Sequence, residues 1–155
     1  MALDPETQRQ LAVDLFNLTW TFLDKPERTI EENDAMIHMA HASRHHWAQV
    51  GAPVNLARGD WQISRVYAVL GRSEPAIYHG QRCLEICQQN QIADFELAYA
   101  DEALARACSV AQQWDTAGKY LELATSAGHA IAELEDKDWF FKDLGTIILP
   151  GSAGG

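Results

Sequence analysis

The sequence predicts an all-α protein of about seven helices, and three observations support this fold class. Apolar residues recur three and four positions apart in successive segments, which is the spacing of one face of an α-helix. Capping residues, glycines and prolines separate these segments, and no stretch alternates apolar and polar residues as a strand does. The chain has 155 residues, 47% of them hydrophobic, which suits one domain with a substantial core. We therefore expect a single helical domain over residues 1–148 and a flexible tail over residues 149–155.

The first two helices have clear start signals. Asp4 can cap a first helix, because a proline follows it at the first helical position. That helix should end before Pro26, since the residue before a proline avoids the helical region. Thr29 and Glu32 form a capping box, which predicts a second helix over residues 30–49.

The middle of the chain predicts three more helices. The third covers residues 53–70, and Gly71 is a suitable residue to end it in a left-handed conformation. Ser73 is expected to cap the fourth helix. Asp94 is expected to cap a fifth helix that runs to Val110.

The last part of the chain predicts one long helix and one short helix. The apolar stripe of the sixth helix begins near Asp115 and continues through Gly128 to Leu134. The acidic run at residues 135–138 interrupts this pattern, and a short last helix is expected over residues 139–146.

The sequence contains an internal repeat with an offset of 41 positions. This offset pairs Ile63 with Leu104, Ser64 with Ala105, Tyr67 with Cys108, Ala76 with Ala117, and Cys83 with Ala124. Small and apolar residues at such positions allow paired helices to approach closely. Antiparallel helix pairs stacked side by side form an α-solenoid.

The repeated residues resemble the tetratricopeptide pattern of small bacterial helical-repeat proteins. Ile63-Ser64 resemble the large-then-small pair of its first helix, Tyr67 its aromatic residue, Gly71 its turn glycine, Ala76 its second-helix alanine, and Cys83 its later small residue. The resemblance covers about residues 55–127, roughly two repeats. The period exceeds the usual ~34 residues, Gly80 and Leu121 replace the second-helix aromatic, and the terminal proline is missing. The resemblance implies a short right-handed superhelix of antiparallel helix pairs, with a concave groove lined by the first helix of each pair.

Charge and cysteine content exclude several classes of protein. A net charge of −10 argues against a nucleic-acid partner, because phosphates are neutralised by a concentrated basic surface. No apolar run approaches the ~20 residues that a membrane span needs. Three cysteines and no leader-like N-terminus predict a reduced, cytoplasmic protein without disulfides.

Candidate binding residues follow from the groove that the resemblance implies. They are Arg58, Trp61, Gln62 and Arg65 on the third helix, and Tyr99, Glu102 and Arg106 on the fifth. Arginines on one helical face can bind a carboxylate or phosphate through two hydrogen bonds, and Trp61 can serve as an apolar anchor. The alternative is structural: the arginines pair with Asp60, Asp101 or Glu102, and Arg65 stacks on Trp61. We predict a noncatalytic module that binds a protein or peptide partner without a cofactor.

Two other hypotheses remain open. His38, His41 and His45 share one helical stripe, which favours a small metal-dependent enzyme or a metal-binding helical bundle, with a further ligand from another helix. Exposed aromatic residues at Trp139, Phe140 and Phe141 would instead favour a homodimer. The three cysteines, Cys83, Cys87 and Cys108, are interpreted as small buried residues.

Overall fold

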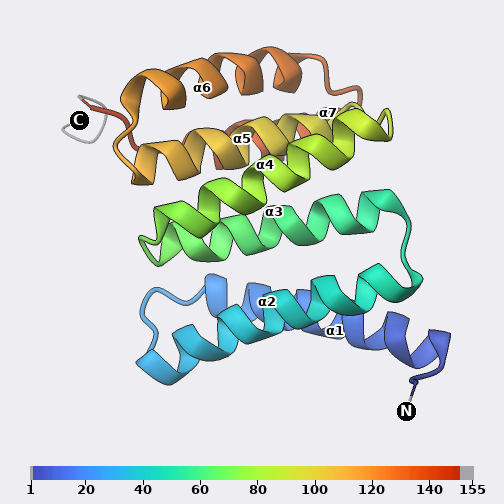
Figure 1. Ribbon diagram of the computed structural model, residues 1–155. Coiled ribbons are helices and arrows are strands. Elements are labelled where there is room, and N and C mark those ends of the chain that lie inside the picture. The colour runs from blue at the N-terminus through green and yellow to red at the C-terminus, as the bar shows by residue number, and fades with distance from the viewer. Residues whose placement is uncertain (1, 151–155) are drawn as a thin grey trace.

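The chain folds into seven α-helices within residues 2–150, the part that this computed structural model describes (Figure 1). The helices are α1 (Pro5–Leu23), α2 (Ile30–Val50), α3 (Pro53–Val69), α4 (Ser73–Gln89), α5 (Phe95–Val110), α6 (Trp114–His129) and α7 (Leu134–Leu144). No strand occurs among these residues, so the predicted all-α class is confirmed. The predicted tail over residues 149–155 lies outside the described residues from position 151 onward.

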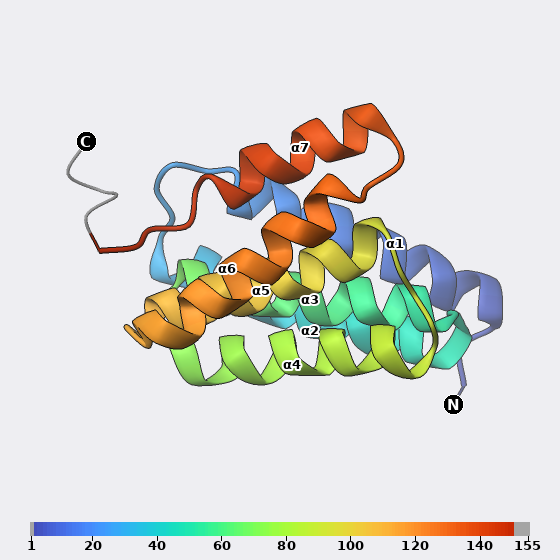
Figure 2. The same ribbon diagram turned by 90° about the horizontal axis from the view of Figure 1, so that it is seen from above.

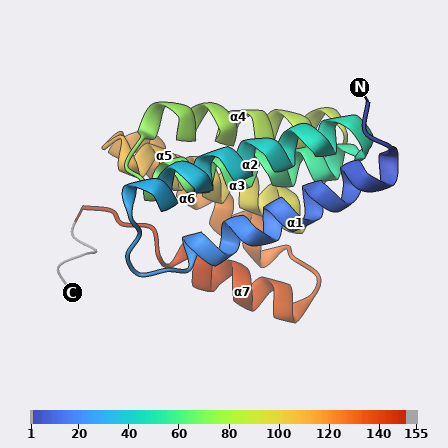
Figure 3. The same cartoon turned by 90° about the horizontal axis from the view of Figure 1, so that it is seen from below.

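The first six helices form three antiparallel pairs, α1–α2, α3–α4 and α5–α6, stacked one on the next (Figure 1). Each helix packs against its neighbours in the chain, and α3 also packs against α1 and α5. α7 packs against α5 and α6 and lies on the α1 side of the stack, opposite α4 (Figures 2 and 3). The predicted stack of helix pairs is therefore confirmed. α7 lies on the side of the stack formed by α1, α3 and α5, and this side is called the inner face below. No helix within residues 2–150 is both long enough and apolar enough to cross a bilayer.

Two of the four predicted N-terminal caps are present. The Thr7 N–H donates to Asp4 Oδ1 at 3.0 Å, and Thr29 and Glu32 form both hydrogen bonds of the capping box. The prediction for Ser73 is wrong, whereas Asp94 occupies the predicted N-cap position of α5 but makes no capping hydrogen bond with its side chain. Ser73 is the first residue of α4, with no side-chain cap before it. Asp94 has a backbone φ of 62°, and its side chain instead accepts a hydrogen bond from the segment after α6.

Two helix ends lie 41 positions apart and have the same geometry. Gly71 ends α3 with a φ of +74°, and the next residue's N–H donates to the Tyr67 carbonyl at 2.9 Å. Gln112 ends α5 with a φ of +59°, and the next residue's N–H donates to the Cys108 carbonyl at 2.9 Å. Both are Schellman motifs, which require a residue in the left-handed region. The repeat offset found in the sequence therefore also describes the backbone.

The boundary between α6 and α7 differs from the prediction. The apolar stripe predicts one helix through Gly128 to Leu134, whereas α6 ends at His129 and α7 begins at Leu134. The acidic run at residues 135–138 therefore opens a helix instead of interrupting one, because carboxylates interact favourably with a helix N-terminus. The turn brings Phe140 onto the bare Cα of Gly128, where an added Cβ would lie 2.5 Å from ring atom Cε1.

Residues related by the repeat offset form much of the core. The buried members are Ile63 and Leu104, Ser64 and Ala105, Ala76 and Ala117, and Cys83 and Ala124, none more than 2% exposed. Close approach explains why several of these residues are small: the Ser64 hydroxyl donates to the Ala76 carbonyl at 2.7 Å, and Gly80 packs against Leu104. These contacts join α3, α4 and α5, and they are compatible with a helical-repeat fold.

Candidate functional site

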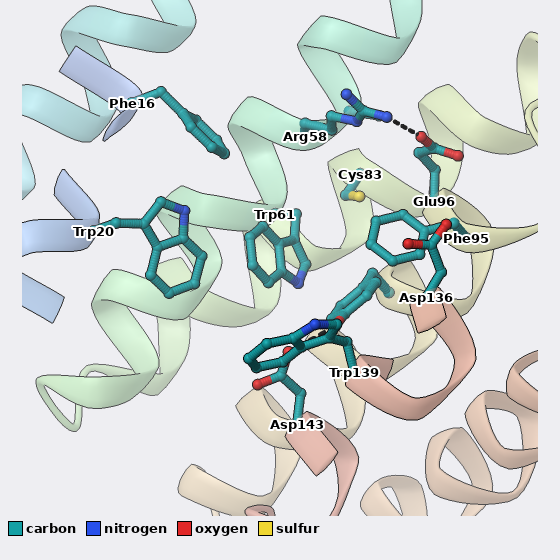
Figure 4. Close-up of a pocket in the computed structure, with 12 residues that line it drawn as sticks. Phe16, Trp20, Arg58, Trp61, Cys83, Phe95, Glu96, Asp136, Trp139 and Asp143 are labelled. Carbon is teal, nitrogen blue, oxygen red and sulfur yellow. Dashed lines mark hydrogen bonds and ion pairs between the residues drawn. The ribbon is translucent and has the colours of Figure 1, made fainter. Parts of the chain in front are cut away.

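A pocket opens on the inner face of the stack, between α1 on one side and α7 on the other (Figure 4). α3 and α5 form its floor, and its volume is about 410 Å³. The lining residues are Phe16 and Trp20 from α1; Ala57, Arg58 and Trp61 from α3; Cys83 from α4; Phe95, Glu96 and Tyr99 from α5; and Asp136, Trp139 and Asp143 from α7. Half of these side chains are aromatic, so the pocket offers a mainly apolar surface with a few charges.

Four of the aromatic rings form a connected layer across the pocket. Trp61 lies at its centre, with ring-centroid distances of 5.5 Å to Trp20 and 5.3 Å to Tyr99. Phe95 packs edge-on against Tyr99 at 4.7 Å, and Trp139 from α7 is 55% exposed at the open side. Rings in such tilted and edge-to-face contacts hold one another in fixed orientations. The floor is therefore held by ring contacts, and part of the Trp139 side chain is exposed at the opening of the pocket.

Charged groups lie at the edge of this aromatic layer. Arg58 on α3 forms an ion pair with Glu96 on α5, and the Arg58 side chain is half exposed. On α7, Asp136 lies one helical turn before Trp139 and Asp143 lies one turn after it, so all three share one face of that helix. The wall formed by α7 thus combines an exposed indole with two carboxylates.

A buried ionic network adjoins the floor and is centred on Glu102, which is fully buried. Its Oε1 accepts hydrogen bonds from Arg65 at 3.1 Å and from Arg106 at 2.7 and 2.9 Å. Its Oε2 accepts a hydrogen bond from the Trp61 indole N–H at 3.0 Å. Burial alone would raise the pKa of Glu102, but Arg65 and Arg106 outweigh it and hold that pKa below its ordinary value. Glu102 therefore stays ionised and fixes the Trp61 ring.

The same network anchors α7 to the stack. Arg106 Nη2 also donates to the Asp143 carbonyl at 3.0 Å and to the Thr146 hydroxyl at 2.8 Å. The Tyr99 hydroxyl donates to Asp143 Oδ2 at 2.6 Å, and burial together with this bond raises the pKa of Tyr99. Phe140 is fully buried in the same core cluster as Tyr99. Polar and apolar contacts together set the position of the α7 wall.

The predicted binding residues fall into two groups. Arg58, Trp61 and Tyr99 line the pocket. Gln62, Arg65, Glu102 and Arg106 lie behind its lining: Gln62 donates to the Phe16 carbonyl at 2.9 Å, and the other three form the network described above. Arg65 also lies 5.5 Å from the Trp61 ring centroid. The structural alternative thus describes the contacts of Arg65 and Arg106, whereas Arg58 pairs with Glu96 and not with a predicted partner.

Seven further polar and aromatic lining residues were outside the predicted set. They are Phe16, Trp20, Phe95, Glu96, Asp136, Trp139 and Asp143. The four-residue spacing of Phe16 and Trp20 indicates a shared helical face, and this signal was available in the sequence. The contribution of α7 was not, because it depends on how the last helix folds back over α5 and α6.

The histidine stripe does not converge on one point. His38 and His45 are exposed, whereas His41 bonds to the Tyr67 hydroxyl at 2.8 Å and contacts the His79 ring. Burial, followed by the charge of His79, lowers the pKa of His41. Within residues 2–150, no three His, Cys, Asp or Glu side chains are placed to hold one metal ion. The metal-site alternative stays a prediction, and the geometry adds nothing in its favour.

The three cysteines are buried and free. Cys83 reaches the pocket wall, but its hydrogen bond with Cys87 and its burial raise its pKa well above 9.0. A protonated thiol is a weak nucleophile, so this position contributes packing.

The aromatic residues predicted to form a homodimer contact are not all exposed. Phe140 is fully buried, and Phe141 is partly buried against His129. Trp139 is the exposed member of the three. The homodimer itself stays a prediction.

Comparison of the chain with protein-family models, with curated proteins and with solved structures gives no match. The resemblance to tetratricopeptide repeats therefore rests on the repeat offset, the buried small residues and the stacking of the helix pairs.

Proposed function

We propose that this chain is a noncatalytic, tetratricopeptide-like module that binds a peptide segment of a partner protein. The observation that carries the proposal is the aromatic pocket of about 410 Å³ on the inner face of α1, α3 and α5. This volume suits one or two side chains of a bound peptide. The backbone of that peptide would follow the groove between α1 and α7.

The composition of the pocket supports recognition. Tryptophan, tyrosine and arginine are the residues that contribute most often to binding energy at protein interfaces. Trp20, Trp61, Tyr99, Trp139 and Arg58 all line this pocket. The floor is already ordered by ring contacts and by Glu102, so binding would require little reorganisation.

The state of the titratable groups favours binding over chemistry. The Cys83 thiol is held protonated, and Glu102 is buried with all its contacts inside the protein. The Tyr99 hydroxyl donates a hydrogen bond to Asp143, and this bond also positions α7. These groups already serve the structure. We also place the protein in the cytoplasm, where its three free, buried cysteines would remain reduced.

The proposal can be tested by selecting a phage-displayed library of random dodecapeptides on the purified protein. We expect enriched peptides that bind the wild type and lose most of their affinity for Trp139→Ala, because that side chain is an exposed part of the pocket wall. Trp114→Ala is the matched control, since Trp114 is 39% exposed and does not line the pocket.

Two outcomes would reject the proposal. One is that no peptide is enriched over repeated rounds. The other is that the enriched peptides bind Trp139→Ala and Trp114→Ala equally well, because they would then use another surface.

A further inference from the structure

The charges on the pocket wall are unevenly balanced. Three carboxylates, Glu96, Asp136 and Asp143, line the pocket together with one guanidinium, that of Arg58. Arg58 is already paired with Glu96. The side chain of Asp136 has no hydrogen-bond or ion-pair partner within residues 2–150, although it lies on the pocket wall (Figure 4). Asp143 interacts electrostatically with Arg106, so Asp136 is the carboxylate of this wall that has no cationic partner among the described residues.

The aromatic rings of the pocket already attract cations from within the chain. The Arg65 guanidinium lies 5.5 Å from the Trp61 ring centroid, and the Lys142 ammonium lies 4.8 Å from the Trp139 ring centroid. Among aromatic side chains, the indole of tryptophan attracts a cation most strongly. Trp61 and Trp139 both line the pocket, so a cation bound there would lie among indole rings.

We infer that the pocket takes the basic side chain of a peptide, lysine or arginine, with its alkyl chain against Trp61 and Trp139 and its charged end toward Asp136 and Asp143. This inference rests on the proposed peptide-binding function and names the chemistry of the bound residue. One oxygen of Asp143 accepts the Tyr99 hydroxyl, and a carboxylate has further lone pairs for a second donor. A planar guanidinium or an ammonium group can supply that donor.

Other classes of side chain fit the pocket less well. An acidic side chain would meet Asp136 and Asp143 as like charges. An apolar side chain would fill the aromatic space, but it would remove water from Asp136 without replacing the lost hydrogen bonds. The net charge of −10 acts in the same direction, because it favours the approach of basic segments and repels acidic ones.

The test uses two small probes of nearly equal shape, Nα-acetyl-arginine methylamide and Nα-acetyl-citrulline methylamide. They differ in charge, because citrulline replaces the guanidinium with a neutral urea. Binding is followed by tryptophan fluorescence and by amide chemical shifts in NMR. We expect the arginine probe to bind about tenfold more tightly than the citrulline probe, and its affinity to fall as salt is added.

A pair of variants on α7 locates the contact. Asp136→Asn should weaken binding of the arginine probe by about three- to tenfold and leave the citrulline probe almost unchanged. Asp138→Asn is the matched control, because it removes the same charge from the same helix at an exposed position that does not line the pocket. It should leave both probes unchanged.

The outcomes separate this inference from the function on which it rests. Equal binding of the two probes, equal effects of Asp136→Asn and Asp138→Asn, or no binding by either probe at 10 mM would each overturn the inference. If the library then still yields peptides that depend on Trp139 and carry apolar anchors, peptide binding stands and the basic ligand is wrong. If the library yields no such peptides, both proposals fail.

Discussion

Two glycines of α6 allow the docking of α7 to be tested by the same substitution at two sites. A Cβ added at Gly128 would lie 2.5 and 2.7 Å from atoms of Phe140 and 2.8 Å from Phe141. A Cβ added at Gly118 would meet nothing within 4 Å. Both residues belong to α6, so Gly128→Ala and Gly118→Ala differ mainly in the contact with α7.

The expected magnitudes follow from two opposing effects. Alanine is favoured over glycine by about 1 kcal/mol in a helix interior, so Gly118→Ala should raise the free energy of unfolding by about that amount. Gly128→Ala gains less, because it lies in the last turn, and forcing atoms into a packed core costs about 1–3 kcal/mol. Phe140 is fully buried and cannot move aside without losing that burial. We expect Gly128→Ala to be less stable than Gly118→Ala by about 2–4 kcal/mol, because the gain at Gly118 adds to the loss at Gly128.

Urea and thermal unfolding followed by circular dichroism measure this difference. For a chain of this length, 1 kcal/mol corresponds to about 2–4 °C in Tm. Because α7 supplies one wall of the pocket and carries Trp139, Gly128→Ala should also change the tryptophan fluorescence of the protein, whereas Gly118→Ala should not. Equal stabilities of the two variants would refute the close packing of α7 on Gly128.

Three further predictions concern buried charge and backbone strain. Burial raises the pKa of Asp101 from 3.8 to about 6, so the folded protein loses stability as the pH rises through that range and Asp101 ionises. In urea unfolding at pH 8, Asp101→Asn should therefore be more stable than the wild type by about 1 kcal/mol. This difference in stability should disappear toward pH 4. Glu102→Ala leaves Arg65 and Arg106 without their counter-charge, so calorimetry should show a fall of about 3–5 kcal/mol in the free energy of unfolding. A fall below about 1 kcal/mol would contradict the network. Gln112 has a φ of +59°, so Gln112→Gly should stabilise the protein by about 0.5–1 kcal/mol, whereas the same change at Gln113, whose φ is −88°, should not.

Much of the fold could be predicted from local sequence signals. The capping box at Thr29 and the left-handed turn at Gly71 each depend on a few neighbouring residues, and both predictions are confirmed. Asp94 and the end of α6 depend on distant contacts instead. Asp94 accepts a hydrogen bond from the segment after α6, and α6 ends where Phe140 folds back over Gly128. Local patterns cannot report such tertiary contacts.

The site was harder to predict for the same reason. Helical spacing places Arg58, Trp61, Arg65, Glu102 and Arg106 on inner faces, but it does not show which of them reach the open surface. Burial of Glu102 draws Arg65 and Arg106 into an ionic network, because a buried carboxylate needs counter-charges. Once those arginines are engaged, the aromatic residues and the α7 carboxylates remain as the exposed chemistry.

The repeat explains why an asymmetric site can form on a regular stack. Residues 41 positions apart occupy equivalent places on neighbouring helix pairs, so they lie side by side where the inner helices pack. The buried positions keep small or apolar residues in both copies, because α3, α4 and α5 could not otherwise pack closely. The inner positions carry no such constraint. Trp61 and Glu102 are equivalent by this offset, and the indole of one donates to the carboxylate of the other at 3.0 Å. Divergence between the two copies thus converts equivalent positions into bonding partners, and that bond holds the central ring of the pocket in place.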